Sequence, residues 1–300
     1  MKTNTDYFRR KQPFKDGFAG KTAVILGAAS GIGYALAEAL VDQNVKLIIG
    51  DIDEAALNQA RDALIARGGN VTAICCDVTS KEQIEAFANQ AFDRLGEVNL
   101  LFNNAGVMAP TLPFVKVSED VLRWVFEVNV FGAWNVCSTF TRRLLKQSAS
   151  AHIVNTASEQ SVCASAPFFS VYAGAKAAVT GFSGILRMEL PDHIALSVLC
   201  PGLVKTKLIK SPGNRPEQFG GPIKSVVEAF EIGMQPAEVA RRCLKGIQRG
   251  DYYIFTHYST KYVAEEQSNE IVRSLTEQTA AHPEWEAWDM RRIITESLNS

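Results

Sequence analysis

The chain has 300 residues, of which 47% are hydrophobic and 21% charged, and its formal net charge is −1 at pH 7. This composition is typical of a soluble globular protein, and so small a net charge gives no strong attraction to nucleic acid or anionic membrane. No apolar run approaches the ~18 residues that span a bilayer, and the N-terminus lacks the apolar core of a secretory signal. We therefore expect a cytoplasmic protein that binds neither nucleic acid nor membrane.

The six cysteines and four histidines form no metal-binding pattern. No two cysteines have C-x-x-C spacing, and no two histidines stand in an H-x-x-x-H pair. Reduced, mostly buried thiols fit a cytoplasmic protein best. The sequence therefore predicts no metal site.

Short apolar runs alternate with longer amphipathic stretches from about residue 21. The runs predict strands at 22–26, 46–50, 71–76, 98–102, 152–155, 195–200 and 252–255. Helical patterns occupy 32–41, 53–67, 81–95, 119–146 and 168–190. Strands that are apolar throughout are buried on both faces, as in a parallel sheet covered by helices. This alternation predicts an α/β fold with a doubly wound parallel sheet, the Rossmann fold, and helices on both faces.

We expect one catalytic domain over residues 17–256, with an N-terminal extension (1–16) and a C-terminal helical extension (257–300). Residues 205–236 interrupt the regular pattern with several prolines and glycines, directly after a strand end. Open α/β sheets bind their ligands at such strand ends, so we expect a substrate lid rather than an inert surface insertion. The polar C-terminal extension could fold back on the core or dock on a neighbouring subunit.

Three glycines, Gly27, Gly31 and Gly33, stand between a predicted strand and a predicted helix. Glycine allows a tight turn and lets backbone N–H groups approach a pyrophosphate at the positive end of a helix. The pattern predicts a dinucleotide site to which Ser30 and Ile32 of the same loop also contribute. A glycine-rich turn without a ligand is the alternative.

Asp51 follows the second predicted strand, 24 positions after Gly27. A carboxylate there can accept hydrogen bonds from both hydroxyls of the adenosine ribose, and it would repel a 2′-phosphate. Neither Ser30 nor Ile52 supplies a positive charge for such a phosphate, so the sequence favours NAD over NADP. Asp51 could instead cap the following helix, but Asp53 is better placed to do so.

Tyr172 and Lys176 are four residues apart, which places a phenol and an ammonium group on one face of a helix. The phenol normally loses its proton near pH ~10, but Lys176 and a positive nicotinamide ring would both favour the phenolate. The spacing alone is weak evidence, because Tyr7 and Lys11 share it. Only Tyr172 both follows a serine-bearing strand and opens a helical pattern.

Together these residues resemble the short-chain dehydrogenase/reductase family, from about residue 17 to residue 255. The matching pieces occur in the family's order: Gly27-x-x-x-Gly31-x-Gly33, Asp77-Val78, Asn103–Gly106, Asn129, Ser158, Tyr172-x-x-x-Lys176 and Pro201-Gly202…Thr206. Two positions depart from the family's pattern. Leu26 stands where the family usually has threonine, and the charged Glu159 follows Ser158 without an evident reason.

The resemblance implies a role for each matching residue. Tyr172 would be the general acid or base, Lys176 and Asn129 would form a proton relay, and Ser158 would donate a hydrogen bond to the substrate oxygen. Ser158 could instead cap the strand end, and Ser161 is a competing hydroxyl. The cofactor would also contact Asp77, Val78, Asn104, Ala105, Gly106, Tyr172, Lys176, Pro201, Gly202, Val204 and Thr206.

Candidate substrate residues are apolar, which suits a hydrophobic aromatic or alicyclic secondary alcohol or its ketone. They are Met108, Val162, Phe168, Phe169 and Leu208. Residues 205–255 also resemble those of bacterial dehydrogenases for benzylic alcohols of lignin-derived dimers, while steroid-like or terpenoid alcohols are comparable candidates.

Two other functions remain as alternatives to a dehydrogenase. An NAD-binding sensor without turnover has no need of the intact Ser158, Tyr172 and Lys176, and sugar-nucleotide epimerases or dehydratases usually space their glycines differently. In the family, helices such as 119–146 and 168–190 pack against a second subunit. We therefore expect a homodimer or homotetramer.

Overall fold

The computed structural model describes residues 9–163, 166–223, 232–258, 260–282 and 284. The chain divides into two compact units, residues 1–258 and residues 259–300. In the second unit, helix α9 (Thr260–Ala281) is the described element. No helix in the described ranges is both long and apolar enough to cross a membrane.

The first unit is built on a seven-stranded sheet in the order β3-β2-β1-β4-β5-β6-β7, in which every neighbouring pair is parallel. The strands are β1 (Thr22–Leu26), β2 (Lys46–Asp51), β3 (Val71–Cys75), β4 (Leu100–Asn103), β5 (Ala151–Thr156), β6 (Ile194–Cys200) and β7 (Tyr253–Phe255). The predicted doubly wound parallel sheet is confirmed. The strand order changes direction between β1 and β4, and such a switch point is where open sheets bind ligands.

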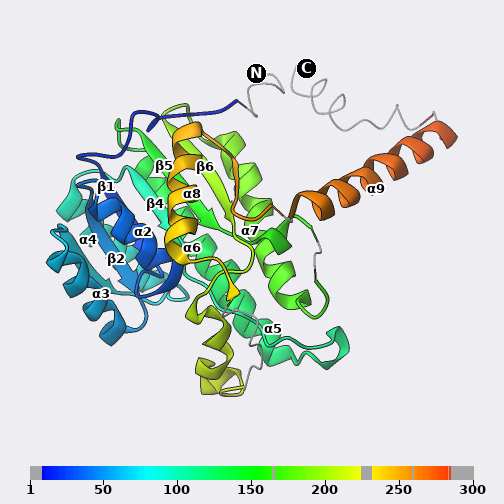
Figure 1. Ribbon diagram of the computed structural model, residues 1–300, viewed down its shortest axis with the longest axis horizontal. Coiled ribbons are helices and arrows are strands. Elements are labelled where there is room, and N and C mark those ends of the chain that lie inside the picture. The colour runs from blue at the N-terminus through cyan, green and yellow to red at the C-terminus, as the bar shows by residue number, and fades with distance from the viewer. Residues whose placement is uncertain (1–8, 164–165, 224–231, 259, 283, 285–300) are drawn as a thin grey trace. The chain divides into compact units, whose positions relative to one another are not determined.

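Helices cover both faces of this sheet because its strands are apolar on both sides. Along β1, Ala23 and Ile25 pack into one core cluster and Val24 and Leu26 into the other, as the two-residue period of a strand requires. The first cluster receives α2 (Gly31–Val41), α3 (Glu54–Ala66) and α8 (Pro236–Arg249), and α2 and α8 lie side by side across this face (Figure 1). The second cluster receives α4 (Lys81–Leu95), α6 (Ala133–Leu144) and α7 (Ser170–Glu189).

The stretch predicted as one helix over 119–146 is interrupted. Helix α5 (Glu119–Phe126) leads into a π-helical turn, η2 (Glu127–Gly132), and the chain then continues as α6. Turns of this kind widen a helix locally and are frequent at functional sites. This one contains Asn129.

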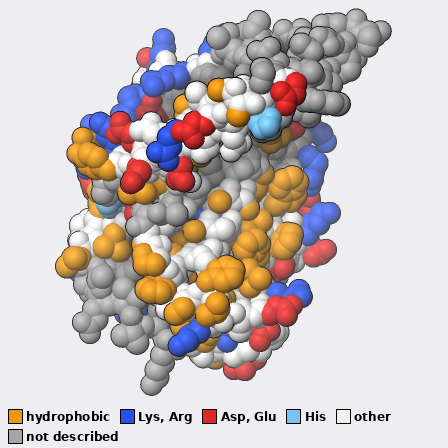
Figure 2. Space-filling model, turned by 90° about the vertical axis from the view of Figure 1, so that its right-hand side faces the viewer, with side chains coloured by type: hydrophobic (Ala, Val, Ile, Leu, Met, Phe, Trp, Pro, Cys, Tyr) orange, Lys and Arg blue, Asp and Glu red, His pale blue; other side chains and the backbone are white. Residues whose placement is uncertain are grey.

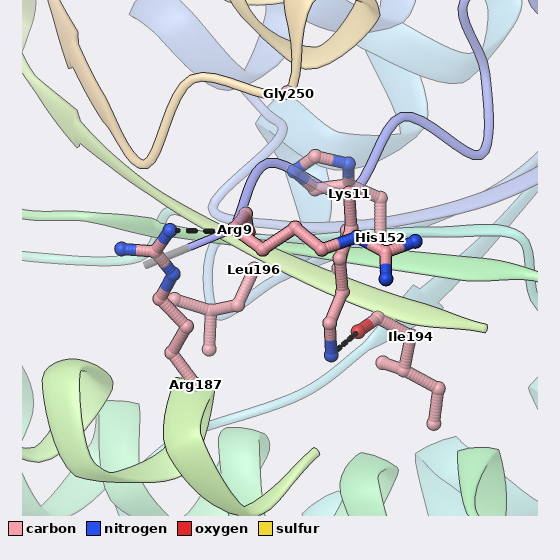
Figure 3. A pocket seen from close by; sticks show the side chains of 8 residues that line it. Arg9, Lys11, His152, Arg187, Ile194, Leu196 and Gly250 are labelled. Atoms are coloured by element: carbon pink, nitrogen blue, oxygen red, sulfur yellow. Dashed lines mark hydrogen bonds between the residues drawn. The ribbon is translucent and has the colours of Figure 1, made fainter. Parts of the chain in front are cut away.

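The amino ends of the strands are closed by residues 9–18 of the same unit. Lys11 Nζ donates to the carbonyl oxygens of Leu190 (2.9 Å), Pro191 (2.8 Å) and Ile194 (3.2 Å), and Phe14 is buried in the core. A cavity of about 10 Å³ lies here, lined by Lys11, His152 and their neighbours (Figure 3). It holds at most one water molecule, so the functional site lies elsewhere.

Candidate active site

The carboxyl ends of β1, β4, β5 and β6 bring the predicted motifs to one edge of the sheet. The glycine loop follows β1, Asn104 to Gly106 follow β4, Ser158 follows β5, and the Pro201–Gly202 turn follows β6. Because all four strands are parallel, these segments leave the sheet in the same direction.

Two positions of the glycine loop, Gly27 and Gly33, have no room for a side chain. Gly27 has φ +76°, and a Cβ there would lie 2.6 Å from the Cα of Ala105. A Cβ on Gly33 would lie 2.0 Å from the carbonyl oxygen of Gly27. Asn104 Nδ2 donates to that same oxygen at 3.0 Å, which fixes the loop against β4.

This loop opens directly into the first turn of α2. In the described structure the Ser30 side chain, at the N-cap, makes no capping hydrogen bond to that turn. The backbone N–H groups of the first turn of α2, together with the positive end of the helix dipole, suit a phosphate group. The residues present therefore fit a dinucleotide at this position. Thr206 closes over the loop from the other side, since its Cγ2 is 3.2 Å from where a Cβ of Gly31 would be.

The Asp51 carboxylate lies at the end of β2, beside the glycine loop. Its Oδ2 accepts a hydrogen bond from the backbone N–H of Ala29 (3.0 Å), and its Oδ1 accepts one from Asp53 (3.2 Å). Each oxygen keeps a second lone pair for a ligand hydroxyl. Asp53 caps α3 by accepting from the N–H of Ala56 (3.0 Å), so Asp51 is not needed as the cap. Ile52 is exposed.

Asp77 and Val78 form the turn that follows β3. Asp77 Oδ1 accepts hydrogen bonds from the N–H (2.9 Å) and the hydroxyl (2.8 Å) of Thr79, which holds the turn rigid. Val78 is buried against Gly132, where an added Cβ would come within 2.7 Å of its Cγ2. On the far side of the site, Val204 pairs with Met234 in an isolated bridge.

Ser158, Tyr172 and Lys176 are each less than a tenth exposed and lie together. The Ser158 hydroxyl is near enough to the Tyr172 phenol to lower its pKa, and Lys176 Nζ lies 5.8 Å from the centroid of the Tyr172 ring. Lys176 Nζ donates to the carbonyl oxygen of Thr156 at 2.9 Å. The spacing that predicted one helical face for Tyr172 and Lys176 is realised on α7.

Burial shifts both titrating side chains toward their neutral forms. It raises the pKa of Tyr172 to about 12, a shift that the nearby Ser158 hydroxyl opposes. Burial alone lowers the pKa of Lys176 to about 8. Strongly perturbed groups of this kind, close together at a ligand-binding edge, are typical of a site that transfers protons.

Asn129 is fully buried and acts on the backbone beside Lys176. Its Oδ1 accepts from the N–H of Val107 and its Nδ2 donates to the carbonyl oxygen of Val107, both at 2.8 Å. A Cβ on Gly106 would lie 2.9 Å from Asn129 Oδ1 and 3.3 Å from Lys176 Nζ. The amide, the ammonium group and the Gly106 backbone therefore meet at one point.

The predicted substrate residues lie in three different surroundings. Met108 is buried in an apolar cluster that contains Tyr172, and Phe169 and Leu208 pack against this cluster. Val162 packs instead against the core cluster that holds α4 and α6. Phe168 is 52% exposed and has φ +70°, an uncommon backbone conformation for an aromatic residue.

The predicted lid consists of two short 3₁₀ helices in its described part, η4 (Lys207–Asn214) and η5 (Glu217–Phe219). Residues 224–231 of the predicted lid lie outside the described residues. Ile209 of η4 is buried in the same cluster as Tyr172. The segment therefore packs over the site.

Three residues at the site were not predicted from the sequence. Thr156 receives the Lys176 hydrogen bond, Ser211 Oγ accepts from the N–H of Met108 (2.7 Å), and His257 contacts Gly202. Thr156 could have been identified from the sequence, because it stands two residues before Ser158. Ser211 and His257 carry no local signal, because each acts on a residue that is distant in sequence.

No group of three or more His, Cys, Asp or Glu side chains that could hold a metal ion occurs among the described residues. The chemical groups at the site are therefore the hydroxyl of Ser158, the phenol of Tyr172 and the ammonium group of Lys176, together with a glycine loop that fits a dinucleotide.

Comparison with known proteins identifies this arrangement. Residues 21–216 match the family model described as short chain dehydrogenase. The 1-deoxy-11-beta-hydroxypentalenate dehydrogenase of Streptomyces exfoliatus is 31% identical over 281 residues, covering 93% of this chain and 98% of that protein. The CLA biosynthesis dehydrogenase/reductase of Lactiplantibacillus plantarum is 28% identical, covering 85% and 94%.

A solved structure agrees with these matches in both sequence and shape. A short-chain dehydrogenase/reductase from Burkholderia phymatum, solved in complex with NAD, superposes with a TM-score of 0.81. It is 33% identical, and the match covers 86% of this chain and 96% of that one. The chain belongs to the short-chain dehydrogenase/reductase family of oxidoreductases.

Proposed function

We propose that the protein is an NAD-dependent alcohol dehydrogenase or ketoreductase whose substrate is a hydrophobic, aromatic or alicyclic secondary alcohol or the matching ketone. The meeting of Ser158, Tyr172 and Lys176 beside the glycine loop carries the proposal. A hydrogen-bond donor, a proton-transfer group and a buried cation are what the interconversion of an alcohol and a ketone requires.

Bound NAD would accept the hydride in oxidation and return it in reduction. Ser158 holds the substrate oxygen by a hydrogen bond that strengthens as negative charge develops there. Tyr172 takes the hydroxyl proton in oxidation and gives it back in reduction. With a pKa of about 12 the free phenol is protonated at neutral pH, so Tyr172 is ready to act as the acid.

In oxidation Tyr172 must lose its proton, and two positive charges favour this loss. One is the Lys176 ammonium group, 5.8 Å from the ring centroid, and the other is the oxidised nicotinamide. The proton then passes from Tyr172 by way of Lys176 to solvent. Asn129 completes this relay by fixing the Gly106–Val107 backbone around the ammonium group.

The surroundings of Tyr172 support a hydrophobic substrate. The cluster that contains it is lined by Met108, Trp124 and Ile209, with Phe169 and Leu208 packed against it. The Streptomyces relatives are named as acting on a hydroxylated carboxylate, 1-deoxy-11-beta-hydroxypentalenate. Carboxylated alicyclic alcohols therefore belong beside neutral aromatic alcohols in any substrate survey.

The proposed activity is tested by measuring NADH formation from NAD with a panel of such alcohols. We expect the native protein to oxidise at least one of them and the Tyr172→Phe variant to lose 100-fold or more of kcat, on the order of general acid-base catalysis. The Kd of the variant for NADH should change far less than kcat, because the aromatic ring of residue 172 is kept. Binding of NAD without turnover of any alcohol would instead favour a sensor, and turnover of a sugar nucleotide would favour an epimerase or dehydratase.

We further propose that Asp51 makes NAD the preferred coenzyme. Its carboxylate would accept hydrogen bonds from the ribose hydroxyls and repel a 2′-phosphate. We expect kcat/KM with NAD to exceed that with NADP by 10-fold or more, and Asp51→Ser to reduce this ratio by about 10-fold, since one charged hydrogen bond is worth roughly 1.5 kcal/mol. A native enzyme that prefers NADP would contradict the assignment.

A second copy of the chain is the proposed partner, in a homodimer or homotetramer. Hydrophobic side chains gather on the face turned to the viewer in Figure 2, on the side where α5 and α7 lie. Trp134 of α6 is 54% exposed and packs edge-on against Phe182 of α7, with ring centroids 5.5 Å apart. Large apolar side chains left exposed in neighbouring helices are typical of a protein interface.

A further inference from the structure

The residues that follow β5, β6 and β7 are tied together in series at the active-site edge. After β5, the Ser158 hydroxyl and the Glu159 N–H donate to the carbonyl oxygen of Pro201, at 3.4 and 3.0 Å. After β6, Pro201 leads into Gly202 and Leu203. After β7, His257 contacts both of these last two residues. The turn after β6 is therefore held from both sides.

The partners of His257 assign a donor or acceptor role to each nitrogen of its ring. Gly202 donates its backbone N–H to Nδ1 at 3.0 Å, which requires Nδ1 to carry no proton. Nε2 lies 3.0 Å from the carbonyl oxygen of Leu203, which can only accept, so Nε2 carries the hydrogen. The Thr256 hydroxyl lies 2.8 Å from Nδ1 and can donate to it as well. The imidazole thus bridges the N–H of Gly202 and the carbonyl oxygen of the adjacent Leu203.

Gly202 lies between His257 and Glu159 with no space for a side chain. An added Cβ would be 2.7 Å from the Oε2 of Glu159 and 2.7 Å from the Cγ of His257. Substitution of this glycine would therefore push the turn away from both partners. Glu159, unexplained by the sequence, forms one wall of this narrow space.

We propose that His257 is a positioning residue for the dinucleotide: it holds the Pro201–Leu203 turn in the shape that accepts the cofactor. This inference rests on the proposed function and on the family resemblance, which implies that Pro201 and Gly202 contact the cofactor. A backbone turn keeps its shape only if its polar groups have fixed partners, and the imidazole supplies one partner to a donor and one to an acceptor. His257 acts through the turn and need not touch the ligand.

Three substitutions separate the two halves of this bridge. In His257→Asn the amide oxygen can take the place of Nδ1 and accept from Gly202. In His257→Gln the amide nitrogen can take the place of Nε2 and donate to Leu203. His257→Phe keeps a flat ring and removes both hydrogen bonds. His282→Phe, in α9's unit, is the matched control for loss of an imidazole elsewhere.

The readout is the Kd for NADH, measured by the fluorescence of the bound nucleotide in the full-length protein. We expect His257→Phe to raise this Kd about tenfold, as loss of one or two hydrogen bonds would, while His257→Asn recovers most of the affinity. His257→Gln should lie between them, and His282→Phe should match the native protein. With an active substrate, KM for NAD should rise with Kd while kcat changes less than about threefold.

A native Kd for His257→Phe overturns the proposal, and so does an equal loss of affinity in all three variants that follows the loss of folding stability in urea. A graded loss of affinity at constant stability supports it. Because Kd needs no turnover, this result stands even if every alcohol fails and the proposed dehydrogenase activity is wrong.

Discussion

Tyr172 and Lys176, the residues proposed to transfer the proton, are both nearly buried. Lys176 is 4% exposed, and its one hydrogen bond to a backbone oxygen, that of Thr156, replaces only part of the hydration of an ammonium group. Its lowered pKa measures the part that is not replaced. The protein therefore gives up folding stability to keep a cation at this point, as active sites commonly do.

The cost of burying this cation predicts a stabilising substitution. The pKa of Lys176 falls from 10.5 to about 8 on folding, so the folded state holds its proton less tightly than the unfolded chain. Below pH 8 the full penalty applies, and it disappears as pH rises toward 10.5. We expect Lys176→Met to raise the free energy of unfolding at pH 7 by about 1–3 kcal/mol and to abolish activity.

Urea denaturation of both proteins at pH 7 and pH 10 measures this effect. The gain should shrink at pH 10, where the unfolded lysine also begins to lose its charge. A variant that is less stable than the native protein at pH 7 would show that packing or the bond to Thr156 outweighs desolvation. The near-isosteric methionine keeps the packing contribution small.

For single residues, the sequence predicted which ones belong to the candidate site better than it predicted what they contact. Gly27 could be identified because a tight turn beside another backbone leaves no alternative to glycine. The partner of Asn129 could not, since Val107 lies 22 positions earlier and is brought near only by the fold. Phe168 and Phe169 look equivalent in sequence, yet only Phe169 packs against the Tyr172 cluster.

Among the elements, η4 links the substrate side of the site to the loop that follows β4. Ser211 Oγ accepts from the N–H of Met108 and donates to the carbonyl oxygen of Leu208 (2.5 Å). Arg215 closes the far end by donating to the carbonyl oxygens of Gly221 (2.6 Å) and Gly220 (3.1 Å). In the described part of the proposed lid, the Ser211 hydroxyl therefore joins η4 to the loop that follows β4.

Removing that contact should loosen the cover without touching the chemistry. In Ser211→Ala the half-buried N–H of Met108 loses its partner, at a cost of about 1–3 kcal/mol to the closed arrangement. We expect KM for the alcohol to rise about 5- to 20-fold, with kcat changed less than about threefold. Steady-state kinetics with the best alcohol of the panel measure this. An equal rise in Kd for NADH would contradict a role confined to the substrate side.

The elements themselves were largely predictable, because parallel strands buried on both faces are apolar throughout. The break between α5 and α6 was not. Apolar residues continue through 127–132 with nearly helical spacing, so the pattern over 119–146 indicates one helix. The π-helical turn depends instead on Gly132 fitting against Val78 and on Asn129 bonding to Val107, which are contacts made by the folded chain.

On the scale of the whole molecule, the helix layer that contains α4, α6 and α7 exposes large apolar side chains. Trp134 of α6 and Ile185 of α7 are 54% and 60% exposed, and Phe131 of the π-helical turn is 56% exposed. The α3 helix of the other layer also exposes Ile65 (48%), but there it stands among charged and small residues. Single exposed apolar residues are ordinary, whereas a set that includes a tryptophan in contact with Phe182 indicates an interface.

Light scattering of the native protein should therefore give the mass of two or four chains of 32.8 kDa. Trp134→Glu places a charge in the centre of the proposed interface, so we expect a shift to the mass of one chain or a much weaker self-association. Ile65→Glu is the matched control and should leave the assembly unchanged. Far-UV circular dichroism of each variant separates dissociation from unfolding.

Since the Ser158, Tyr172 and Lys176 side chains all come from one chain, a dissociated Trp134→Glu variant that is folded should still bind NADH. If the native protein is already a single chain, the apolar face has another partner and the proposed self-association is wrong.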